Sequence, residues 1–277
     1  MKRINRDLKI RRFRLAGFTL IELLIAVLLA AIVTSAAMGI YIAQHKQLIV
    51  QDEVTDMQAN IRAAAVELTS KIRMAGYKVP EGIPKLEASN TNPDTITITF
   101  DSGGFEDVTV EHPMPQPSSE LRCDGHDVSP LQDDDWVFIY DPFTRTGEFF
   151  LVTQVQVDAS HIQHNTMALS RIYPVGSQVI MMNQFKYYID NSNPDHPNLI
   201  AWTHRTGPQV FAENITDLNF QYVLASGQIV DTFVDEDMVR EVVITIDART
   251  DKRDLEFHTD YRTRGLDTRV KVRNLGS

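Results

Sequence analysis

Cysteine is almost absent from this sequence, and its scarcity limits how the fold can be held together. Cys123 is the only cysteine among 277 residues. A single thiol excludes an intrachain disulfide, so the packing of apolar side chains must stabilise the fold. The hydrophobic share of 43% is sufficient for the core of one large domain or of two ordinary ones. The composition therefore indicates a packed protein and excludes a disordered chain.

The sequence signatures of common enzymes are also missing. The chain carries no GxSxG, P-loop, HExxH or dinucleotide-binding pattern. Cys123 and His126 lie in the loop segment RCDGHDVSP, which has no oxyanion motif and no residue that would orient the histidine. We expect Cys123 to be a free surface thiol or a partly buried one. We predict that the protein is not an enzyme and has no catalytic residue and no cofactor.

Three groups of polar residues raise the question of a metal site. The acids at 133–135 are hard-oxygen ligands that calcium could use, but no EF-hand spacing follows them, and capping of a strand that begins at Trp136 is the better interpretation. The acids at 235–237 are more simply a solvated turn. His161 and His164 would point to opposite faces of a strand, which disfavours a shared ion. We predict no metal.

Charge is distributed unevenly along the chain. Residues 1–17 hold one acid, Asp7, and seven basic residues: Lys2, Arg3, Arg6, Lys9, Arg11, Arg12 and Arg14. This segment has a balance of +6, so the rest of a chain with net charge -10 has a balance of -16. A strongly acidic body argues against sequence-independent binding of nucleic acid, which requires a basic surface. We predict no nucleic-acid partner.

Charged side chains are nearly absent from residues 18–43, where Glu22 is the exception. As a helix this segment would be about 39 Å long, enough to cross a hydrocarbon core of about 30 Å. The basic residues before it predict a cytoplasmic N-terminus, with the rest of the chain across the membrane. A secretory signal peptide is the alternative interpretation. It is disfavoured because the apolar run is longer than usual and no small-x-small cleavage site closes it.

Proline is absent between Phe18 and Val79, so the helix can continue beyond the apolar run. Gly76 and Pro80 supply its stop signal. In the second half, apolar residues recur at spacings of three and four: Val50, Val54, Met57, Ile61, Ala64 or Ala65, Leu68, Ile72 and Ala75. A membrane tether with a helical stalk would explain this length. It would not explain Glu22, whose carboxylate costs several kcal/mol in lipid without a partner.

The string GFTLIELLIAVLLAAIV resembles the class III signal of type IV pilins and related pseudopilins. The resemblance implies cleavage by prepilin peptidase between Gly17 and Phe18, followed by N-methylation of Phe18. The apolar segment would then stay in the mature protein. In such filaments the carboxylate of Glu22 would attract the cationic N-terminal amine of a neighbouring subunit, and this attraction strengthens where water is excluded.

Gly39 lies about where major pilins carry a helix-weakening proline. A glycine there allows local stretching of the helix, or it allows close helix packing together with Ser35 and Ala36. The sequence leaves both interpretations open.

The rest of the chain is rich in β-strand patterns. Strict alternation predicts half-buried strands at 95–100 and 217–224. A hairpin is expected from 135–140 and 147–157, which flank the turn-rich segment DPFTRTG. Further strands are expected near 162–169, 178–189 and 239–248, the last with Val242, Ile244, Ile246 and Ala248 on its core face. Surface loops are expected at 80–94, 112–135 and 190–198.

One long helix followed by many strands predicts an α+β fold, with the second half of the helix packed on an antiparallel β-rich domain, as in the pilin fold. We divide the chain into a basic leader (1–17), a transmembrane and filament-core helix (18–44), the amphipathic half of that helix (45–77) and a β-rich globular domain (78–277). The size of that domain and the segments at 207–227, 239–250 and 269–275 resemble minor pilins of the PilW type or J-type minor pseudopilins.

The resemblance implies a minor pilin that joins the filament tip, where it primes assembly or presents an adhesive surface. A minor pseudopilin of a type II secretion system and a membrane-anchored binding module are the alternatives, and a tethered hydrolase with an unrecognised site is a further one. The implied partners are prepilin peptidase, other minor and major pilins, the inner-membrane assembly platform and inner-membrane lipids. The implied location is the inner membrane as a single-pass protein, then a surface pilus or a periplasmic pseudopilus.

Overall fold

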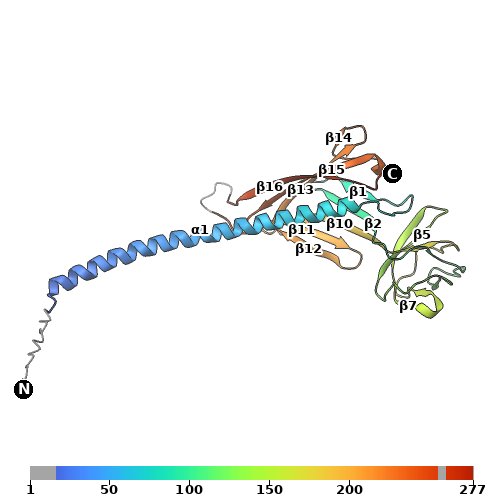
Figure 1. Cartoon of the computed structure of the whole chain (residues 1–277), viewed down its shortest axis with the longest axis horizontal. Helices are drawn as coiled ribbons and strands as arrows, with labels where there is room; N and C mark the ends of the chain where they lie inside the picture. Colours follow the sequence, from blue (N-terminus) through green and yellow to red (C-terminus); the bar gives the residue numbers. More distant parts are fainter. Residues whose placement is uncertain (1–16, 255–259, 277) are drawn as a thin grey trace, which may run out of the picture. The chain divides into compact units, whose positions relative to one another are not determined.

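The computed structural model describes residues 17–254 and 260–276, so the predicted basic leader lies outside the described residues except for Gly17. The chain divides into two compact units, residues 1–52 and 53–277. Helix α1 (Leu20–Met74) begins in the first unit and ends in the second (Figure 1). The prediction of one long N-terminal helix is confirmed.

The end of α1 is set by Gly76, as the sequence predicted. Gly76 has a left-handed backbone with φ of 78°, and its N–H donates to the carbonyl of Thr99 at 3.0 Å. A Cβ at this position would lie 2.7 Å from the carbonyl oxygen of Asn274. Both the backbone conformation and the close approach therefore require glycine here.

The second half of α1 buries one stripe of side chains in the body of the protein. The stripe consists of Met57, Ile61, Ala64, Ala65, Leu68 and Ile72. These residues share a core with apolar side chains from two antiparallel sheets. The predicted packing of an amphipathic helix on antiparallel strands is therefore confirmed, and the fold class is α+β.

The first of these sheets has five strands in the order β1-β2-β10-β11-β12. Its strands are β1 (Leu86–Ser89), β2 (Thr95–Asp101), β10 (Met182–Asp190), β11 (Asn198–Thr203) and β12 (Gly207–Glu213). The second sheet has four strands in the order β14-β13-β15-β16. Its strands are β13 (Ile215–Leu224), β14 (Ile229–Val230), β15 (Val239–Arg249) and β16 (Thr263–Lys271).

Two smaller sheets are formed by the segment of the chain that lies between β2 and β10 in the sequence. One has the order β3-β9-β5-β6, and the other β4-β8-β7. Their strands are β3 (Val108–Thr109), β4 (Leu121–Arg122), β5 (Trp136–Asp141), β6 (Thr146–Leu151), β7 (Gln154–Gln156), β8 (His161–Gln163) and β9 (Gln178–Ile180). They enclose a second core, and a third small cluster of Phe138, Tyr140 and Met182 contains side chains from both parts. Two 3₁₀ helices complete the described elements, η1 (Val157–Ala159) and η2 (Glu236–Met238).

The strands predicted from strict alternation are confirmed. Residues 95–100 and 217–224 lie in β2 and β13, and the hairpin around DPFTRTG is formed by β5 and β6. The predicted core face of β15 is also correct, because its four residues are fully buried.

Several predicted boundaries are wrong. The segment 147–157 is split between β6 and β7, and 178–189 is split between β9 and β10, because in each case the chain passes from one sheet to another. In 162–169 the strand ends at Gln163, since Met167 N–H bonds back to the His164 carbonyl at 3.1 Å. The expected loops 80–94 and 112–135 contain the short strands β1 and β4.

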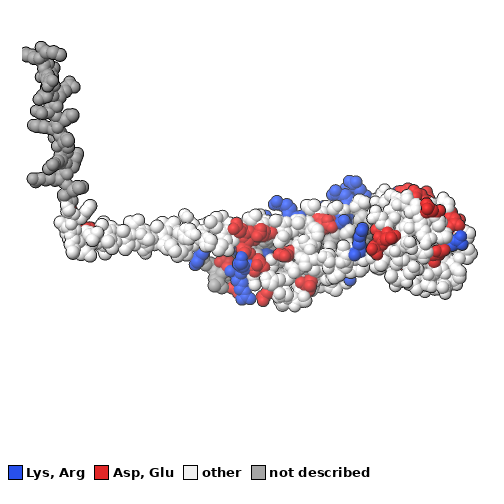
Figure 2. All heavy atoms as spheres, turned by 90° about the horizontal axis from the view of Figure 1, so that it is seen from below, with Lys and Arg blue, Asp and Glu red and all other residues white. Residues whose placement is uncertain are grey.

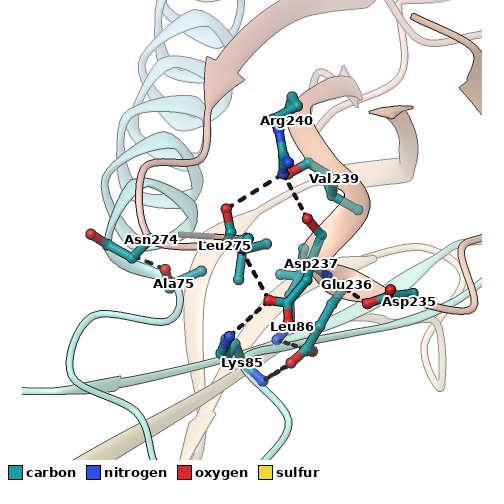
Figure 3. A network of polar contacts seen from close by, with 11 residues as sticks. Ala75, Lys85, Leu86, Asp235, Glu236, Asp237, Val239, Arg240, Asn274 and Leu275 are labelled. Carbon is teal, nitrogen blue, oxygen red and sulfur yellow. Dashed lines mark hydrogen bonds and ion pairs between the residues drawn. The ribbon is translucent and has the colours of Figure 1, made fainter. Parts of the chain in front are cut away.

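The acids at 235–237 are not simply a solvated turn, contrary to the sequence interpretation. Glu236 accepts hydrogen bonds from the backbone N–H groups of Lys85 and Leu86 at 2.9 Å each (Figure 3). Asp237 accepts from Lys85 Nζ at 2.7 Å and from Gly276 N–H at 3.1 Å. The hydrogen bond from Lys85 holds the pKa of Asp237 below its ordinary value. These contacts bind the start of β1 and the C-terminal segment to the turn before β15.

A buried carboxyl group joins the loop before β2 to strand β13. Asp94 is 3% exposed, and its Oδ2 accepts the N–H of Phe220 at 2.9 Å. Its Oδ1 is buried and has no hydrogen-bond partner among the described residues. Burial raises the pKa of Asp94, and the negative charges of Asp217 and Asp231 raise it further.

An Asp94→Asn variant is expected to be more stable than the wild type at pH 7 by about 1 kcal/mol, because it keeps the acceptor for Phe220 and removes a buried charge. A carboxyl group with a raised pKa in the folded state stabilises the fold below its ordinary pKa, and this stabilisation is lost as pH rises through the raised value. The advantage of the variant should therefore shrink toward pH 4. Urea unfolding of the full chain in detergent at both pH values measures it.

The exposed Asp158 supplies the control, because Asp158→Asn changes the same formal charge at a solvated position. It should shift the unfolding free energy by less than about 0.5 kcal/mol at either pH. Equal stability of Asp94→Asn and wild type at pH 7 and pH 4 would contradict a raised pKa at Asp94.

Candidate functional site

The start of α1 is closed by reciprocal hydrogen bonds between Thr19 and Glu22. Thr19 Oγ1 accepts the N–H of Glu22 at 3.3 Å. Glu22 Oε2 accepts both the N–H and the hydroxyl of Thr19, each at 2.9 Å. This arrangement is a capping box, which satisfies N–H groups that the first turn of a helix leaves without partners.

Sequence analysis missed this role of Glu22. The spacing T-x-x-E before an apolar run is the sequence signature of a capping box, and it was present at residues 19–22. All three hydrogen bonds use one carboxylate oxygen or the threonine hydroxyl. The cap holds the carboxylate of Glu22 beside the peptide group that joins Phe18 to Thr19. The pairing of Glu22 with the amine of another subunit stays a prediction.

Gly17 and Phe18 lie in the non-helical backbone just before α1. Phe18 is 89% exposed, and a Cβ added at Gly17 would meet no atom within 4 Å. The peptide bond between Gly17 and Phe18 is thus not covered by other described residues of the chain. Its cleavage and the methylation of Phe18 stay predictions.

The first half of α1 exposes apolar side chains around its whole circumference. They include Leu20, Ile21, Leu23, Leu24, Ile25, Val27, Leu28, Leu29, Ile32, Val33, Ile40 and Ile42. The helix is long and apolar enough to cross a membrane, and none of its most apolar window is buried in the protein. Figure 2 shows this segment almost free of charged atoms, while charged groups of both signs are scattered over the body. These features are consistent with anchoring as a single-pass membrane protein.

Gly39 lies inside the continuous helix, and a Cβ there would meet no atom of the chain within 4 Å. No contact within this chain therefore requires a residue without a side chain at position 39. Gly39 lines a shallow groove on the helix with Ala31 and Ser35, which precede it at intervals of four residues. Such a row of small residues allows another helix to approach closely. Local stretching and close packing both remain interpretations of Gly39.

Comparison with known families finds one match at this end of the chain. Residues 12–38 match the prokaryotic N-terminal methylation motif. No curated protein and no solved structure matches the chain. The motif supports the class of type IV pilin-like proteins, pilins and pseudopilins together, and a structural role for the protein. It also implies processing by a prepilin peptidase and assembly with other pilin-like subunits.

The interpretation of Cys123 as a surface or partly buried thiol is wrong. Cys123 is fully buried in the core of the two smaller sheets. Burial, together with the charges of Glu111 and Asp124, raises the pKa of its thiol to about 12. The thiolate is therefore strongly disfavoured, and the residue behaves as a small apolar core side chain. His126 instead contacts Glu111 and Thr109, each at 3.0 Å.

His161 and His164, which lie at the start of β8 and directly after its end, contact different groups. The ring nitrogens of His164 lie 3.0 Å from the carbonyl of Met167 and 2.7 Å from that of Ser119. The ring of His161 faces the carboxylates of Glu120 and Asp124, at 3.3 and 3.2 Å. His164 is thus a buried structural residue, and His161 belongs to a partly exposed charged cluster.

The acids at 133–135 organise the turn that leads into β5. Asp133 Oδ1 accepts the N–H of Val155 at 2.9 Å, and Asp135 Oδ2 accepts the N–H of Gln132 at 2.9 Å. Asp134 adopts a left-handed backbone with φ of 69°, which aspartate tolerates better than most residues. The predicted capping role is confirmed.

Proposed function

We propose that this protein is a filament subunit that is cleaved after Gly17, methylated on Phe18 and assembled through α1. The observation that carries the proposal is the methylation motif at residues 12–38, which coincides with the start of an apolar helix capped by Thr19 and Glu22. A plain membrane anchor needs neither an acid in the apolar segment nor a cleavage signal before it. The combination is what a processed and extracted subunit requires.

The proposed assembly chemistry depends on where the carboxylate is held. Cleavage after Gly17 would create a cationic amine at Phe18, one residue from the N–H that Glu22 already binds at 2.9 Å. In a bundle of such helices each amine would meet the Glu22 carboxylate of a neighbour. An ion pair in this water-poor bundle is strongly attractive, and either partner alone would be costly. The groove at Ala31, Ser35 and Gly39 would let the helices approach each other.

Within this class we assign the chain to the minor pilins of a type IV pilus, at the filament tip. The assignment is supported by the size of the β-rich domain and by the resemblance of its C-terminal segments to PilW-type proteins. A minor pseudopilin of a type II secretion system, of the J type, is the second candidate and shares this support. The neighbouring genes would separate the two, since pilus and secretion genes form distinct clusters.

The proposal also implies a membrane topology for the chain and a function for each of its four segments. The leader at 1–17 would be cytoplasmic, residues 18–44 would span the inner membrane and then form the filament core, and the amphipathic half at 45–77 would carry the domain at 78–277. That domain would be periplasmic before assembly. Its partners would be the assembly platform and other pilins, and afterwards it would be displayed on a surface pilus or a periplasmic pseudopilus.

Mass spectrometry of the N-terminus tests the processing step. In cells that contain prepilin peptidase we expect a chain that begins with N-methylated Phe18, and in cells without it an uncut chain that begins at Met1. The presence of residues 1–17 in both strains would contradict the proposal. A Gly17→Leu variant in the peptidase-positive strain is the matched control and should remain uncut.

A further inference from the structure

A cleft of about 500 Å³ lies where the five-stranded sheet meets the hairpin of β5 and β6. Figure 1 shows the ends of β2 and β10 reaching the part of the body that contains β5. One side of the cleft is lined by the start of β10, the end of β11 and β12, and the other side by Trp136 and Phe149. The volume lies in the range of sites that hold small molecules.

Aromatic rings form the wall on the hairpin side. The ring of His204 stacks on Phe149 with centroids 4.1 Å apart, and it lies 5.1 Å from the ring of Trp136. Phe185 and the partly exposed Phe211 contribute further aromatic surface from β10 and β12. His204 covers one face of Phe149, and Lys71 Nζ lies 4.0 Å from the centre of the Phe185 ring, so the aromatic surface of the lining comes mainly from the hairpin side.

Amide and hydroxyl groups accompany these rings. The side chain of Asn183 lines the cleft and makes no hydrogen bond to any residue that the structure describes. Gln209 donates from Nε2 to the carbonyl of Thr206 at 3.1 Å, and Gln184 Oε1 lies 3.3 Å from His204 Nε2. The lining thus combines an uncommitted amide with polar groups that are held in place by neighbours.

The charges around the cleft are compensated within the protein. Arg205 lies 3.8 Å from Asp135. Glu67 accepts a hydrogen bond from the hydroxyl of Tyr187 at 2.7 Å and lies 3.8 Å from Lys71 Nζ. Burial lowers the pKa of His204 and so favours its neutral imidazole. The lining favours an uncharged ligand over an anion or a cation.

We propose that this cleft binds a pyranose ring of a saccharide. A pyranose presents a flat C–H face, which packs on aromatic rings, and a rim of hydroxyl groups, which pair with amides. Phe149 and Trp136 supply the rings, and Asn183 supplies an amide with free donors and acceptors. A purely hydrocarbon ligand would bury the Asn183 amide without a partner, which is unfavourable. The proposal is independent of filament assembly, since every residue it uses lies in the body.

Tryptophan fluorescence can detect this binding directly. The chain has two tryptophans, and the rings of both Trp136 and Trp202 lie within 5.1 Å of His204. The full chain would be titrated in an amine-oxide detergent, because sugar-based detergents would compete. The probes are methyl glycosides of glucose, galactose, mannose and N-acetylglucosamine, and their 1,4-linked disaccharides. We expect a saturable change in emission with at least one of them, with a dissociation constant of about 1 mM or lower.

Two variants and two controls make the test specific. Asn183→Ala and Phe149→Ala should each raise the dissociation constant at least tenfold, with unchanged circular dichroism. Phe143→Ala removes a ring that is 80% exposed on the β5–β6 turn and should leave the constant within twofold. Sorbitol, which has hydroxyl groups but no ring face, should give no saturable change.

Either of two results would overturn the saccharide site: no saturable response to any probe, or equal affinity in wild type, Asn183→Ala and Phe149→Ala. If Phe149→Ala does not fold, Asn183→Ala decides alone, because its side chain makes no described contact that the fold needs. None of these results bears on cleavage after Gly17, so the two proposals fail separately.

Discussion

A Glu22→Gln variant is expected to be cleaved and inserted like the wild type but to enter filaments roughly a hundredfold less efficiently. Glutamine can take the same position in a capping box, so the start of α1 stays closed. What the variant lacks is the negative charge. The amine of the neighbouring subunit would then be buried without a counter-charge, at a cost of about 3 kcal/mol. Quantitative immunoblotting of sheared filaments against membranes measures the ratio.

A Thr19→Val variant is the complementary control. It keeps the charge of Glu22 but loses the hydroxyl that accepts the Glu22 N–H and donates to its carboxylate. Loss of such a cap costs about 1 kcal/mol, so incorporation should fall by less than tenfold. If Glu22→Gln assembles normally while Thr19→Val does not, the carboxylate serves only to cap the helix and the proposed ion pair is wrong.

The sequence correctly predicted those helices and strands whose apolar face packs against the same core along the whole segment. The buried stripe of α1 and the alternation in β2, β13 and β15 follow from a single face that packs on a single core. Leu68 and Ile244, for example, are both predicted and fully buried. For such segments the periodicity of apolar residues is sufficient.

The errors occur where a segment changes partners. The pattern of GEFFLVTQVQV continues without interruption, but Val152 N–H bonds to the Asp135 carbonyl and Thr153 N–H to the Gln163 carbonyl. The chain therefore leaves the sheet of β5 and joins that of β8 while both halves stay half-buried. Alternation reports burial and not the identity of the neighbouring strand, so it could not reveal the change.

The candidate sites also differ in how far apart their residues lie in the sequence. Gly17, Phe18 and Glu22 are close in sequence, so a local pattern could point to them. The cleft requires residues that are far apart, since Phe149 and Asn183 come to line one cleft only when β6 and β10 are placed by different sheets. Glu236 was misread for the same reason, because its partners Lys85 and Leu86 are 151 and 150 residues away.

The contacts between the second half of α1 and the two sheets should contribute strongly to the stability of the fold. Leu68 is 0% exposed, and Val66, two residues earlier on the opposite side of α1, is 65% exposed. Leu68→Ala should lower the free energy of unfolding by about 3 kcal/mol, because it removes buried methyl groups and leaves a cavity between the two sheets. Urea unfolding of the full chain in detergent, followed by emission of Trp136 and Trp202, measures it.

Val66→Ala is the matched control, since it shortens an apolar side chain on the same helix. It should change the free energy by less than about 0.5 kcal/mol, because the side chain is already in contact with solvent and alanine favours the helix. Equal effects at both positions would show that the second half of α1 is not part of the folded core. The expected difference means instead that the second half of α1 belongs to the same folded core as the two sheets, through the stripe that contains Leu68.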